Sequence, residues 1–382
     1  MNQKFNRLKK ITILNYNLSN NSLGRAYLLG QLLSDNFQVE IMGPLINGDI
    51  WEPLRNSHIP VKVVPYSKFP FLLFKLPKIL KAIDAEIIYA IKPRFTSFGF
   101  GLLKKFFSKT PLILDIDDWE VSFYLQKGFS SRLSRLIHVF NPNGFFWTWV
   151  IQFFIPCANK VTTVSTFLQR KFGGEIIIHG KDTDFLDPEK FKGSNFKKQL
   201  GLEGKKIVMF LGTPRKYKGL EDVLNAVLSI NDSDLLMMVV GANLSGVYEK
   251  SLKKLGGAKL LLVASVAFQE IPKYLALSDI VVIPQRKTYD TMGQIPSKLF
   301  DAMSMAKPII STKVSDIPDI LNNCGILVDP QSPDQFRRAI LWVFENQDKA
   351  TEMGQKARQK CINEFSFTSM RQKLLNVIGE SI

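Results

Sequence analysis

Residues that build disulfides and metal centres are scarce in this sequence. The three cysteines, Cys157, Cys324 and Cys361, lie far apart and form no CxxC pair, so no disulfide framework is expected. The three histidines are also isolated, which excludes the His spacing of common zinc sites. We therefore expect neither a disulfide-stapled fold nor a bound metal.

Long hydrophobic runs are lacking as well. The first apolar segment, Ile11–Leu14, is interrupted by Thr12 and followed by Asn15, so it falls short of the roughly 7–15 apolar residues of a signal peptide. No run reaches the roughly 20 apolar residues that a membrane-spanning helix needs. The sequence therefore predicts a cytoplasmic protein with reduced cysteines.

Acidic residues are outnumbered by basic ones. The chain has 50 Lys and Arg against 34 Asp and Glu, a formal net charge of +16, and residues 60–110 hold ten basic residues but only Asp84 and Glu86 as acids. Such an excess attracts nucleotide phosphates, nucleic acid or an anionic bilayer. The most apolar segment, Phe145–Ile155, is either a buried helix or one that lies at a membrane interface. Because the basic stretch is rich in aromatics and no nucleic-acid motif appears, we expect attachment to the inner face of the cytoplasmic membrane and no nucleic-acid partner.

The 382 residues exceed the roughly 250–300 at which a single hydrophobic core stops growing. Short β-branched runs alternate with helical patterns, and this alternation restarts after a polar, basic stretch at Asp182–Gly201. Such alternation is typical of βαβ units and predicts two α/β domains with parallel sheets. Strands are expected at residues 11–15, 39–42, 61–64, 86–89, 112–115, 161–164 and 176–179, then at 207–211, 235–240, 260–263, 280–283, 309–311 and 326–328.

A basic loop follows the strand expected at 207–211. Gly212 permits a sharp turn, and Arg215 and Lys218 bring cations to its mouth. The helix expected after Gly219 adds unpaired backbone N–H groups and the positive end of its dipole. The segment is therefore either a diphosphate-binding pocket or a solvated basic turn.

A second motif lies at Gln294–Pro308. Pro296 or Ser297 begins a helix whose first amides would hold a phosphate. Asp301, about one turn later, would accept hydrogen bonds from the ribose hydroxyls. The alternative is that Ser297 and Asp301 only cap the helix and favour its first turn.

Two further strand ends carry polar residues. The loop Asn17–Arg25 enters a helix at the carboxyl end of the first strand, where ligands bind in α/β sheets. The segment Asp115–Glu120 holds four carboxylates and an indole. It indicates recognition of an acceptor hydroxyl, general-base chemistry or a cation site, with a solvated acidic turn as the alternative.

The chain resembles family 4 of the retaining glycosyltransferases, which have the GT-B fold of two Rossmann-like domains facing an interdomain cleft. Three consecutive segments carry the resemblance in its second half: FLGTPRKYKGLEDVLNAV, PSKLFDAMSMAKPIIST and SDIPDILNNCGILVDP. The segment VTTVSTFLQRKFGGEIIIHGKDTDFLDP resembles the strand–helix–strand that closes the family's first domain. The motifs indicate the subgroup with a PSK…(E/D).M segment.

The resemblance implies roles for particular residues. Arg215 and Lys218 would bind the donor diphosphate, and Asp301 the ribose. The residues expected to bind the donor are Gly24, Gly212, Thr213, Gly219, Pro296, Ser297, Lys298 and Asp301. The chain departs from the family's pattern at Thr213, where the family often has Arg, and at Gly293, where it has Glu. The family's first-domain His has no clear counterpart, and Asp118 lies roughly at that place.

We therefore expect a metal-independent, retaining glycosyltransferase that moves a sugar from a UDP- or GDP-sugar to a hydroxyl of a lipid-linked or cell-surface glycan in polysaccharide biosynthesis. Arg215, Lys218 and Asp118 are the expected catalytic residues, and the nucleotide-sugar is a substrate, so no cofactor is expected. The expected division is 1–185 for the acceptor-side domain, 186–365 for the donor domain and 366–382 for a helix packing back toward the first. The alternatives are a GT-B epimerase or hydrolase of nucleotide-sugars and a basic nucleic-acid-binding protein.

Overall fold

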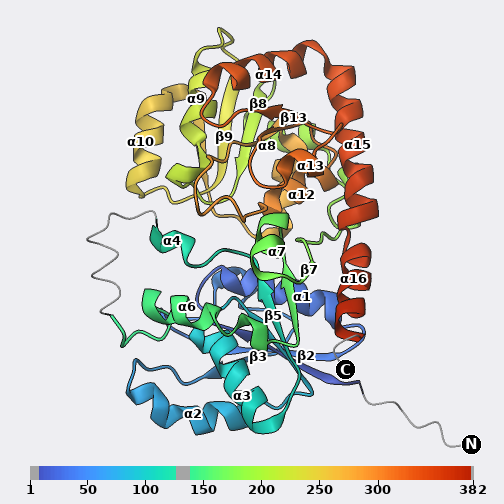
Figure 1. Ribbon diagram of the computed structural model, residues 1–382. Coiled ribbons are helices and arrows are strands. Elements are labelled where there is room, and N and C mark those ends of the chain that lie inside the picture. The colour runs from blue at the N-terminus through green and yellow to red at the C-terminus, as the bar shows by residue number, and fades with distance from the viewer. Residues whose placement is uncertain (1–7, 126–137, 380–382) are drawn as a thin grey trace, which may run out of the picture. The chain divides into compact units, whose positions relative to one another are not determined.

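The computed structural model describes residues 8–125 and 138–379 (Figure 1). The chain divides into two compact units. Unit 1 comprises Met1–His179 and Met370–Ile382, and unit 2 comprises Gly180–Ser369. The polar, basic stretch 182–201, after which the strand–helix alternation restarts, forms the 3₁₀ turn η4 (Pro188–Lys190) and helix α8 (Gly193–Gln199) of unit 2.

Unit 1 is built on a parallel sheet of seven strands in the order β3-β2-β1-β4-β5-β6-β7. The strands are β1 (Lys10–Asn15), β2 (Gln38–Pro44), β3 (Val61–Val64), β4 (Ile87–Ile91), β5 (Leu112–Ile116), β6 (Lys160–Thr163) and β7 (Glu175–Ile176). The central strands are buried on both faces, as parallel strands covered by crossover helices require. The strand order reverses between β1 and β4, so the loops after their carboxyl ends are the natural ligand-binding positions.

Helices cover both faces of this sheet and connect its strands (Figure 1). They are α1 (Ser22–Leu33), α2 (Phe71–Ala82), α3 (Phe100–Ser108), α4 (Ser122–Leu125), α6 (Phe145–Gln152) and α7 (Thr166–Phe172), with short turns η1 (Glu52–Leu54), η2 (Phe95–Gly99) and η3 (Ile155–Cys157). The last helix, α16 (Phe367–Gly379), runs into unit 1, where Arg371 pairs with Asp35 at 2.8 Å and donates to the carbonyl of Leu32 at 3.1 Å.

Unit 2 repeats the architecture with six parallel strands in the order β10-β9-β8-β11-β12-β13. The strands are β8 (Lys206–Leu211), β9 (Leu235–Ala242), β10 (Leu260–Ala264), β11 (Ile280–Ile283), β12 (Ile309–Thr312) and β13 (Ile326–Val328). The helices are α9 (Leu220–Leu228), α10 (Val247–Gly256), α11 (Ile271–Leu277), α12 (Ser297–Ser304), α13 (Ile317–Ile320), α14 (Pro333–Glu345) and α15 (Gln347–Phe365), with turns η5 (Lys216–Lys218), η6 (Gly257–Lys259) and η7 (Phe268–Glu270).

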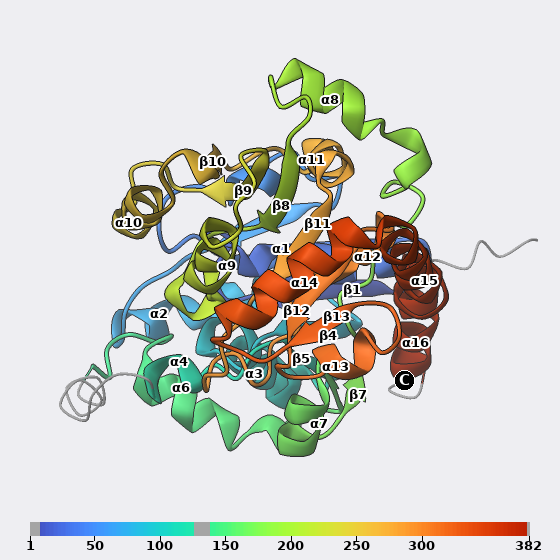
Figure 2. The same ribbon diagram turned by 90° about the horizontal axis from the view of Figure 1, so that it is seen from above.

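The core of unit 2 follows from helical spacing. In α9, Leu220, Val223, Leu224 and Val227 recur at the i, i+3, i+4 and i+7 positions and are fully buried. Helix α14 buries a similar stripe and lies next to α9 against the sheet (Figure 2). This packing holds the end of β8 and the start of α9, which frame the basic loop, on a rigid base.

The expected α/β fold with two Rossmann-like domains is confirmed, and a strand is found at each of the expected places. The strand expected at 176–179 is shorter and earlier, at Glu175–Ile176, although the Ile177 N–H still donates to the Thr163 carbonyl of β6 at 2.8 Å. None of the helices in residues 8–125 and 138–379 combines the length and apolar character needed to cross a membrane.

Candidate active site

Two glycines shape the loop that follows β8. Gly212 has φ +115° and Gly219 has φ +63°, both in the region that side chains disfavour. A Cβ atom on Gly219 would lie 2.2 Å from the carbonyl oxygen of Pro284, so the start of α9 can approach β11 only through a glycine. A Cβ on Gly212 would lie 3.2 Å from the Lys298 Nζ. The two glycines thus leave room for a second chain segment and for a cation at this turn.

Two lysines gather around one aromatic ring at the end of β8. The Lys298 Nζ lies 3.7 Å from the ring centroid of Phe210, and the Lys218 Nζ lies 5.8 Å from it. Lys218 also donates to the carbonyl of Thr213 at 2.7 Å. The ring face supplies only a weak attraction for cations. Within residues 8–125 and 138–379 neither ammonium forms an ion pair with a carboxylate.

The electrostatics of these lysines are unfavourable without a ligand. Burial, reinforced by Arg215, lowers the pKa of Lys218 to about 8. Burial and the neighbouring Lys218 lower the pKa of Lys298 well below its ordinary value, and Asp301 offsets this only in part. An anion at this place would compensate both charges.

Helix α12 begins next to these lysines. Its first residue is Ser297, after Pro296 in an extended conformation, and no side chain caps its first amides. The Ser297 hydroxyl accepts from the Lys181 Nζ at 2.7 Å, and no acid lies in the first turn. The interpretation of Ser297 and Asp301 as a simple helix cap is therefore wrong. The uncapped amides leave the helix N-terminus available to an anion.

Asp301 lies on the same helix and is held by a residue that the sequence did not single out. The Lys181 Nζ is 2.6 Å from the Asp301 Oδ1, and both side chains are almost buried. Lys181 itself is fixed by its backbone, because its N–H donates to the Phe365 carbonyl at 2.9 Å and its carbonyl accepts from the Phe367 N–H at 2.8 Å. Asp301 therefore enters the site as half of an ion pair.

Arg215 and Thr213 lie at the exposed mouth of the loop. Arg215 precedes η5, and its carbonyl accepts from the Lys218 N–H at 2.9 Å. The Thr213 carbonyl is taken by Lys218, as above. The segment after β11 is anchored separately, because Arg286 pairs with Glu221 at 3.3 Å on the first turn of α9. The structure thus brings the expected donor residues of unit 2 together around the end of β8.

The acidic segment of unit 1 is a packed ionic cluster. The Lys92 Nζ contacts the Asp117 Oδ1 at 3.0 Å and the Glu120 Oε1 at 2.7 Å, and it pairs with Asp118 as well. Arg94 pairs with Glu120 from the other side. The solvated acidic turn considered for this segment is therefore wrong. Carboxylates of Asp117, Asp118 and Glu120 lie close enough to hold a metal ion, and the Lys92 ammonium lies among them.

The cluster separates its acids in proton affinity. Burial raises the pKa of Asp117 to about 7, with Asp118 adding to the effect and Lys92 opposing it. Burial also acts on Glu120, but Arg94 and Lys92 outweigh it and lower the pKa of Glu120 to about 2. Glu120 thus stays ionised and balances the charges of Lys92 and Arg94, whereas Asp117 gains or loses its proton near neutral pH. The sequence segment pointed to these acids, but not to Lys92, which follows a different strand.

The loop with Gly24 lies at the start of α1. The Trp51 ring passes 3.4 Å from the place where a Cβ on Gly24 would lie. The neighbouring Arg25 is buried and forms a bidentate pair with Asp115, at 2.9 and 2.8 Å. It also donates to the carbonyl of Ile177 at 2.7 Å. Arg25 therefore joins α1, β5 and the chain after β7, and its charge is already used within unit 1.

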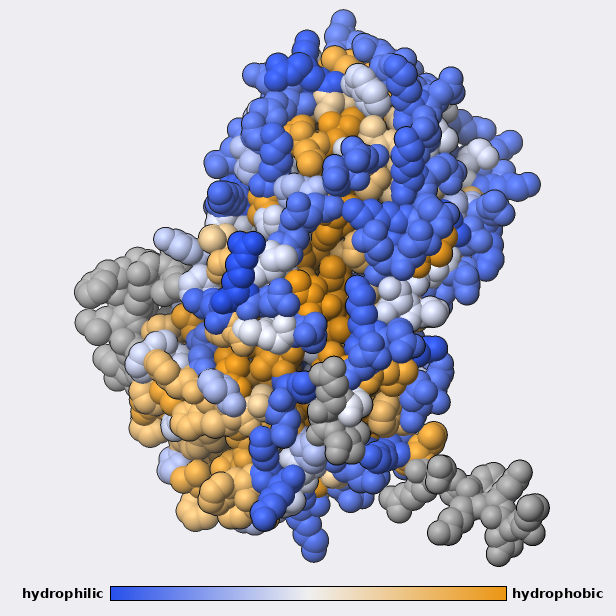
Figure 3. Space-filling model, turned by 45° about the vertical axis from the view of Figure 1, so that its right-hand side comes forward, coloured by the Kyte–Doolittle hydropathy of each residue, from blue (hydrophilic) through white to orange (hydrophobic). Residues whose placement is uncertain are grey.

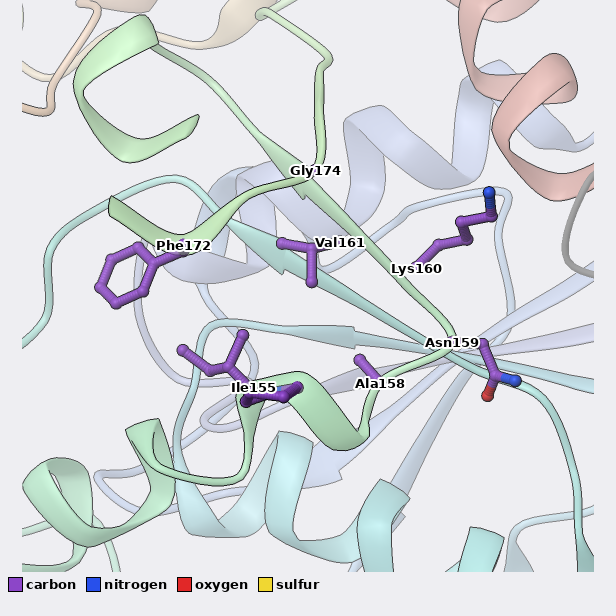
Figure 4. Close-up of a pocket in the computed structure, with 8 residues that line it drawn as sticks. Ile155, Ala158, Asn159, Lys160, Val161, Phe172 and Gly174 are labelled. Carbon is purple, nitrogen blue, oxygen red and sulfur yellow. The ribbon is translucent and has the colours of Figure 1, made fainter. Parts of the chain in front are cut away.

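A shallow hollow is present elsewhere in unit 1. It measures about 350 Å³ and lies along β6 between η3 and the end of α7 (Figure 4). Its walls include Ile155, Ala158, Val161 and Phe172. None of the candidate residues lines it, so it is separate from the site described above.

Comparisons with known proteins concern unit 2 and the fold as a whole. The family model described as glycosyl transferases group 1 matches residues 192–360. Spore coat protein SA of Bacillus subtilis is 27% identical over 192 residues, which are 47% of this chain and 50% of that protein. A GDP-mannose-dependent alpha-(1-6)-phosphatidylinositol monomannoside mannosyltransferase of Mycobacterium tuberculosis is 24% identical over 242 residues, 58% of this chain and 62% of that protein. The alignments thus span about half to three fifths of these curated relatives.

A solved structure extends the likeness to the whole fold. The crystal structure of Anabaena HepE in complex with UDP matches with a TM-score of 0.76 and 16% identity, over 97% of this chain and 100% of that chain. At this identity the likeness shows the fold alone, and that fold is GT-B, as the sequence indicated. Residues 192–360 therefore match the group 1 glycosyl transferases, within a chain of the GT-B fold.

Proposed function

We propose that the chain is a metal-independent, retaining glycosyltransferase of family 4, in the PSK subgroup, with a nucleotide-sugar donor bound by unit 2. One observation carries the proposal. Lys218 and Lys298 share the Phe210 ring at the carboxyl end of β8, with depressed pKa values and no carboxylate partner among the described residues. A nucleoside diphosphate is the anion that this pair and the open start of α12 would bind.

The donor residues would divide the work. Lys218 and Lys298 contact the diphosphate, with Arg215 closing the mouth. The amides after Pro296 and the backbone at Gly212, Thr213 and Gly219 approach the phosphates closely. Asp301, oriented by Lys181, accepts hydrogen bonds from the ribose. This division follows from which groups are charged and unpaired and which are already paired.

The chemistry requires the bond between the sugar C1 and the diphosphate oxygen to break, while an acceptor oxygen forms a new bond to C1 on the same face. Negative charge grows on the departing diphosphate, and preorganised cations stabilise that charge more than they stabilise the bound donor. Lys218 and Lys298 supply this stabilisation from side chains. A metal-independent reaction is consistent with such a pair.

Unit 1 is proposed to bind the acceptor, and Gly24 and Asp118 are proposed to contribute from it. The supporting observation is the ionic cluster around Lys92, which holds Asp118 in place. Asp117, with a pKa of about 7, is the group near Asp118 that can receive a proton. We propose that Asp118 orients the acceptor hydroxyl, and that the hydroxyl belongs to a lipid-linked or cell-surface glycan at the cytoplasmic side of a membrane.

The relatives support both UDP and GDP as the nucleotide. The Mycobacterium relative is named for GDP-mannose, and HepE crystal structures contain UDP and UDP-glucose. The phosphatidylinositol acceptor in the former name supports a lipid-linked acceptor and polysaccharide biosynthesis for this chain.

Binding and product analysis test the proposal. A ligand that binds the native state raises the melting temperature, so UDP and GDP with their sugars should raise it, whereas inorganic phosphate should not. EDTA should leave transfer unchanged, and the product should keep the anomeric configuration of the donor sugar. If neither diphosphate bound, the donor assignment would be wrong. Sugar release that is indifferent to every added acceptor would identify a hydrolase or epimerase instead.

A further inference from the structure

Unit 1 exposes phenylalanine and tryptophan side chains on three neighbouring helical segments. Phe74 of α2 is 81% exposed and Phe106 of α3 is 80% exposed. Seven of the eight exposed phenylalanines in the described part of the chain belong to this surface, and the eighth is Phe268. We call this surface the aromatic face; its members are Phe71, Phe74, Phe106, Phe107, Phe140, Trp149, Phe153 and Phe154.

The three segments form one surface because side chains join them. Lys104 of α3 donates to the Leu80 carbonyl of α2 at 3.2 Å, and Lys105 donates to the Cys157 carbonyl of η3 at 2.8 Å. The Phe69 ring packs on Trp147 of α6, with centroids 4.8 Å apart. Figure 3 shows hydrophobic side chains gathered at the lower left, over this part of unit 1.

The pattern of the helices places these aromatics outward. In α2, Phe71 and Phe74 share a face with Lys78 and Lys81, at positions i, i+3, i+7 and i+10, and all four are exposed. In α6 only Thr148 and Ile151 are buried. The segment Phe145–Ile155, considered above as a buried helix, is therefore only partly buried. Ile151 and Ile155 join the core of unit 1, but three of its aromatic side chains are exposed.

The charge around the aromatic face has one sign. The exposed lysines of residues 60–110 are Lys62, Lys68, Lys78, Lys81 and Lys109. Residues 60–110 contain only two acids, Asp84 and Glu86, which follow α2 and both contact Lys10 at the start of β1. The sequence from 121 to 174 contains no Asp or Glu at all. Basic side chains therefore outnumber acidic ones around the aromatic face.

We propose that the aromatic face and its lysines dock the protein on an anionic lipid bilayer. Aromatic side chains partition into the boundary between headgroups and acyl chains, and lysines beside them attract the anionic headgroups. A second copy of the chain is a poor occupant, since a two-fold contact would bring lysines of both copies together. The proposal rests on the proposed function only in that a lipid-linked acceptor would lie in the same bilayer.

Vesicle flotation of the full chain tests this. Vesicles of phosphatidylcholine are compared with vesicles containing phosphatidylglycerol, at low and high salt. Each lysine near an anionic surface contributes roughly fivefold to partitioning, so the double variant Lys78→Glu, Lys81→Glu should weaken binding by at least about 25-fold. The variant Phe74→Ser, Phe107→Ser should lose binding while its charge is unchanged.

The matched control makes the same charge change in unit 2. Lys250 and Lys254 are exposed on α10. The double variant Lys250→Glu, Lys254→Glu lowers the net charge by the same amount, and it should leave vesicle binding within about twofold of wild type. All variants should melt cooperatively and bind UDP or GDP as the wild type does, because the donor residues are untouched. Retained vesicle binding without nucleotide binding would reject the donor site and leave this proposal standing.

Three results would overturn the proposal. They are equal binding to neutral and anionic vesicles, no binding to either, and an equal loss in the α10 control. If the phenylalanine variant instead abolished a concentration-dependent dimer in the absence of vesicles, the aromatic face would be an interface between copies. If the lysine variant instead lost RNA binding that vesicles could not displace, the face would serve nucleic acid.

Discussion

Replacing Lys218 by methionine is expected to stabilise the unliganded protein and to weaken donor binding. Burial, reinforced by Arg215, lowers the pKa of Lys218 from 10.5 to about 8. The charged form is therefore held in the folded chain at a cost in free energy. Methionine keeps an apolar, flexible stem over the Phe210 ring and removes the charge.

The magnitude follows from the pKa. A fall from 10.5 to about 8 corresponds to about 3 kcal/mol at 1.36 kcal/mol per pKa unit. Solvent still reaches the side chain and screens the interaction, so we expect a gain of about 1–2 kcal/mol. Between pH 10.5 and about 8 the unfolded chain binds more protons at Lys218 than the folded chain, so wild-type stability rises with pH across this window and the variant loses that rise.

Denaturant unfolding at neutral pH and at about pH 10 measures both effects, with UDP and GDP calorimetry on the same samples. Lys216 is exposed in the same turn, and Lys216→Met is the control that should change neither stability nor affinity appreciably. If Lys218→Met destabilised the unliganded chain, the ammonium would be satisfied inside the protein. If it bound nucleotide like wild type, the diphosphate assignment would fail.

Four other substitutions probe the rest of the structure. Lys181→Met should raise KM for the donor and destabilise the folded protein by about 3 kcal/mol, since it leaves Asp301 buried and unpaired. In unfolding experiments the double variant Lys181→Met, Asp301→Leu should recover part of that stability. Asp301→Asn should raise KM with little change in kcat, because the ribose does not change during reaction, and steady-state kinetics will show whether kcat falls instead. Asp118→Asn should lower kcat with acceptor while UDP and GDP affinity stays at the wild-type level; weakened nucleotide binding would contradict its placement on the acceptor side. Gly219→Ala should destabilise by more than about 1 kcal/mol, since its Cβ would lie 2.2 Å from the Pro284 carbonyl at a positive φ, and an unchanged melting temperature would show that the turn can relax.

Local patterns in the sequence were sufficient for the strands and for most of the donor loop. Parallel strands are buried on both faces, so runs such as Ile207–Leu211 and Ile280–Ile283 are recognisable as apolar segments between turns. Glycines with positive φ, such as Gly212, likewise mark a turn by their type. These features depend only on residues close together in the chain, so they can be recognised from the sequence.

Pairs that join distant segments could not be read in the same way. Lys181 and Asp301 are 120 positions apart, and nothing near Lys181 indicates that it holds an acid on α12. Lys92 follows β4, whereas its acidic partners follow β5, so their proximity depends on the order of strands in the sheet. The sequence also could not decide whether α6 is exposed, because an apolar helix of eight residues has the same composition inside the protein and on its surface.

The backbone of Lys181 is hydrogen-bonded to the chain at the junction of α15 and α16, through the Phe365 carbonyl and the Phe367 N–H. The donor-side acid therefore depends on a stretch near the C-terminal end of the sequence, through one lysine. Linkage makes such a dependence reciprocal: whatever favours the Lys181–Asp301 pair must also favour the folded junction. Cleavage by a protease at 365–367 would thus report on donor binding. A bound donor should slow the cleavage, and the cut protein should bind its nucleotide more weakly.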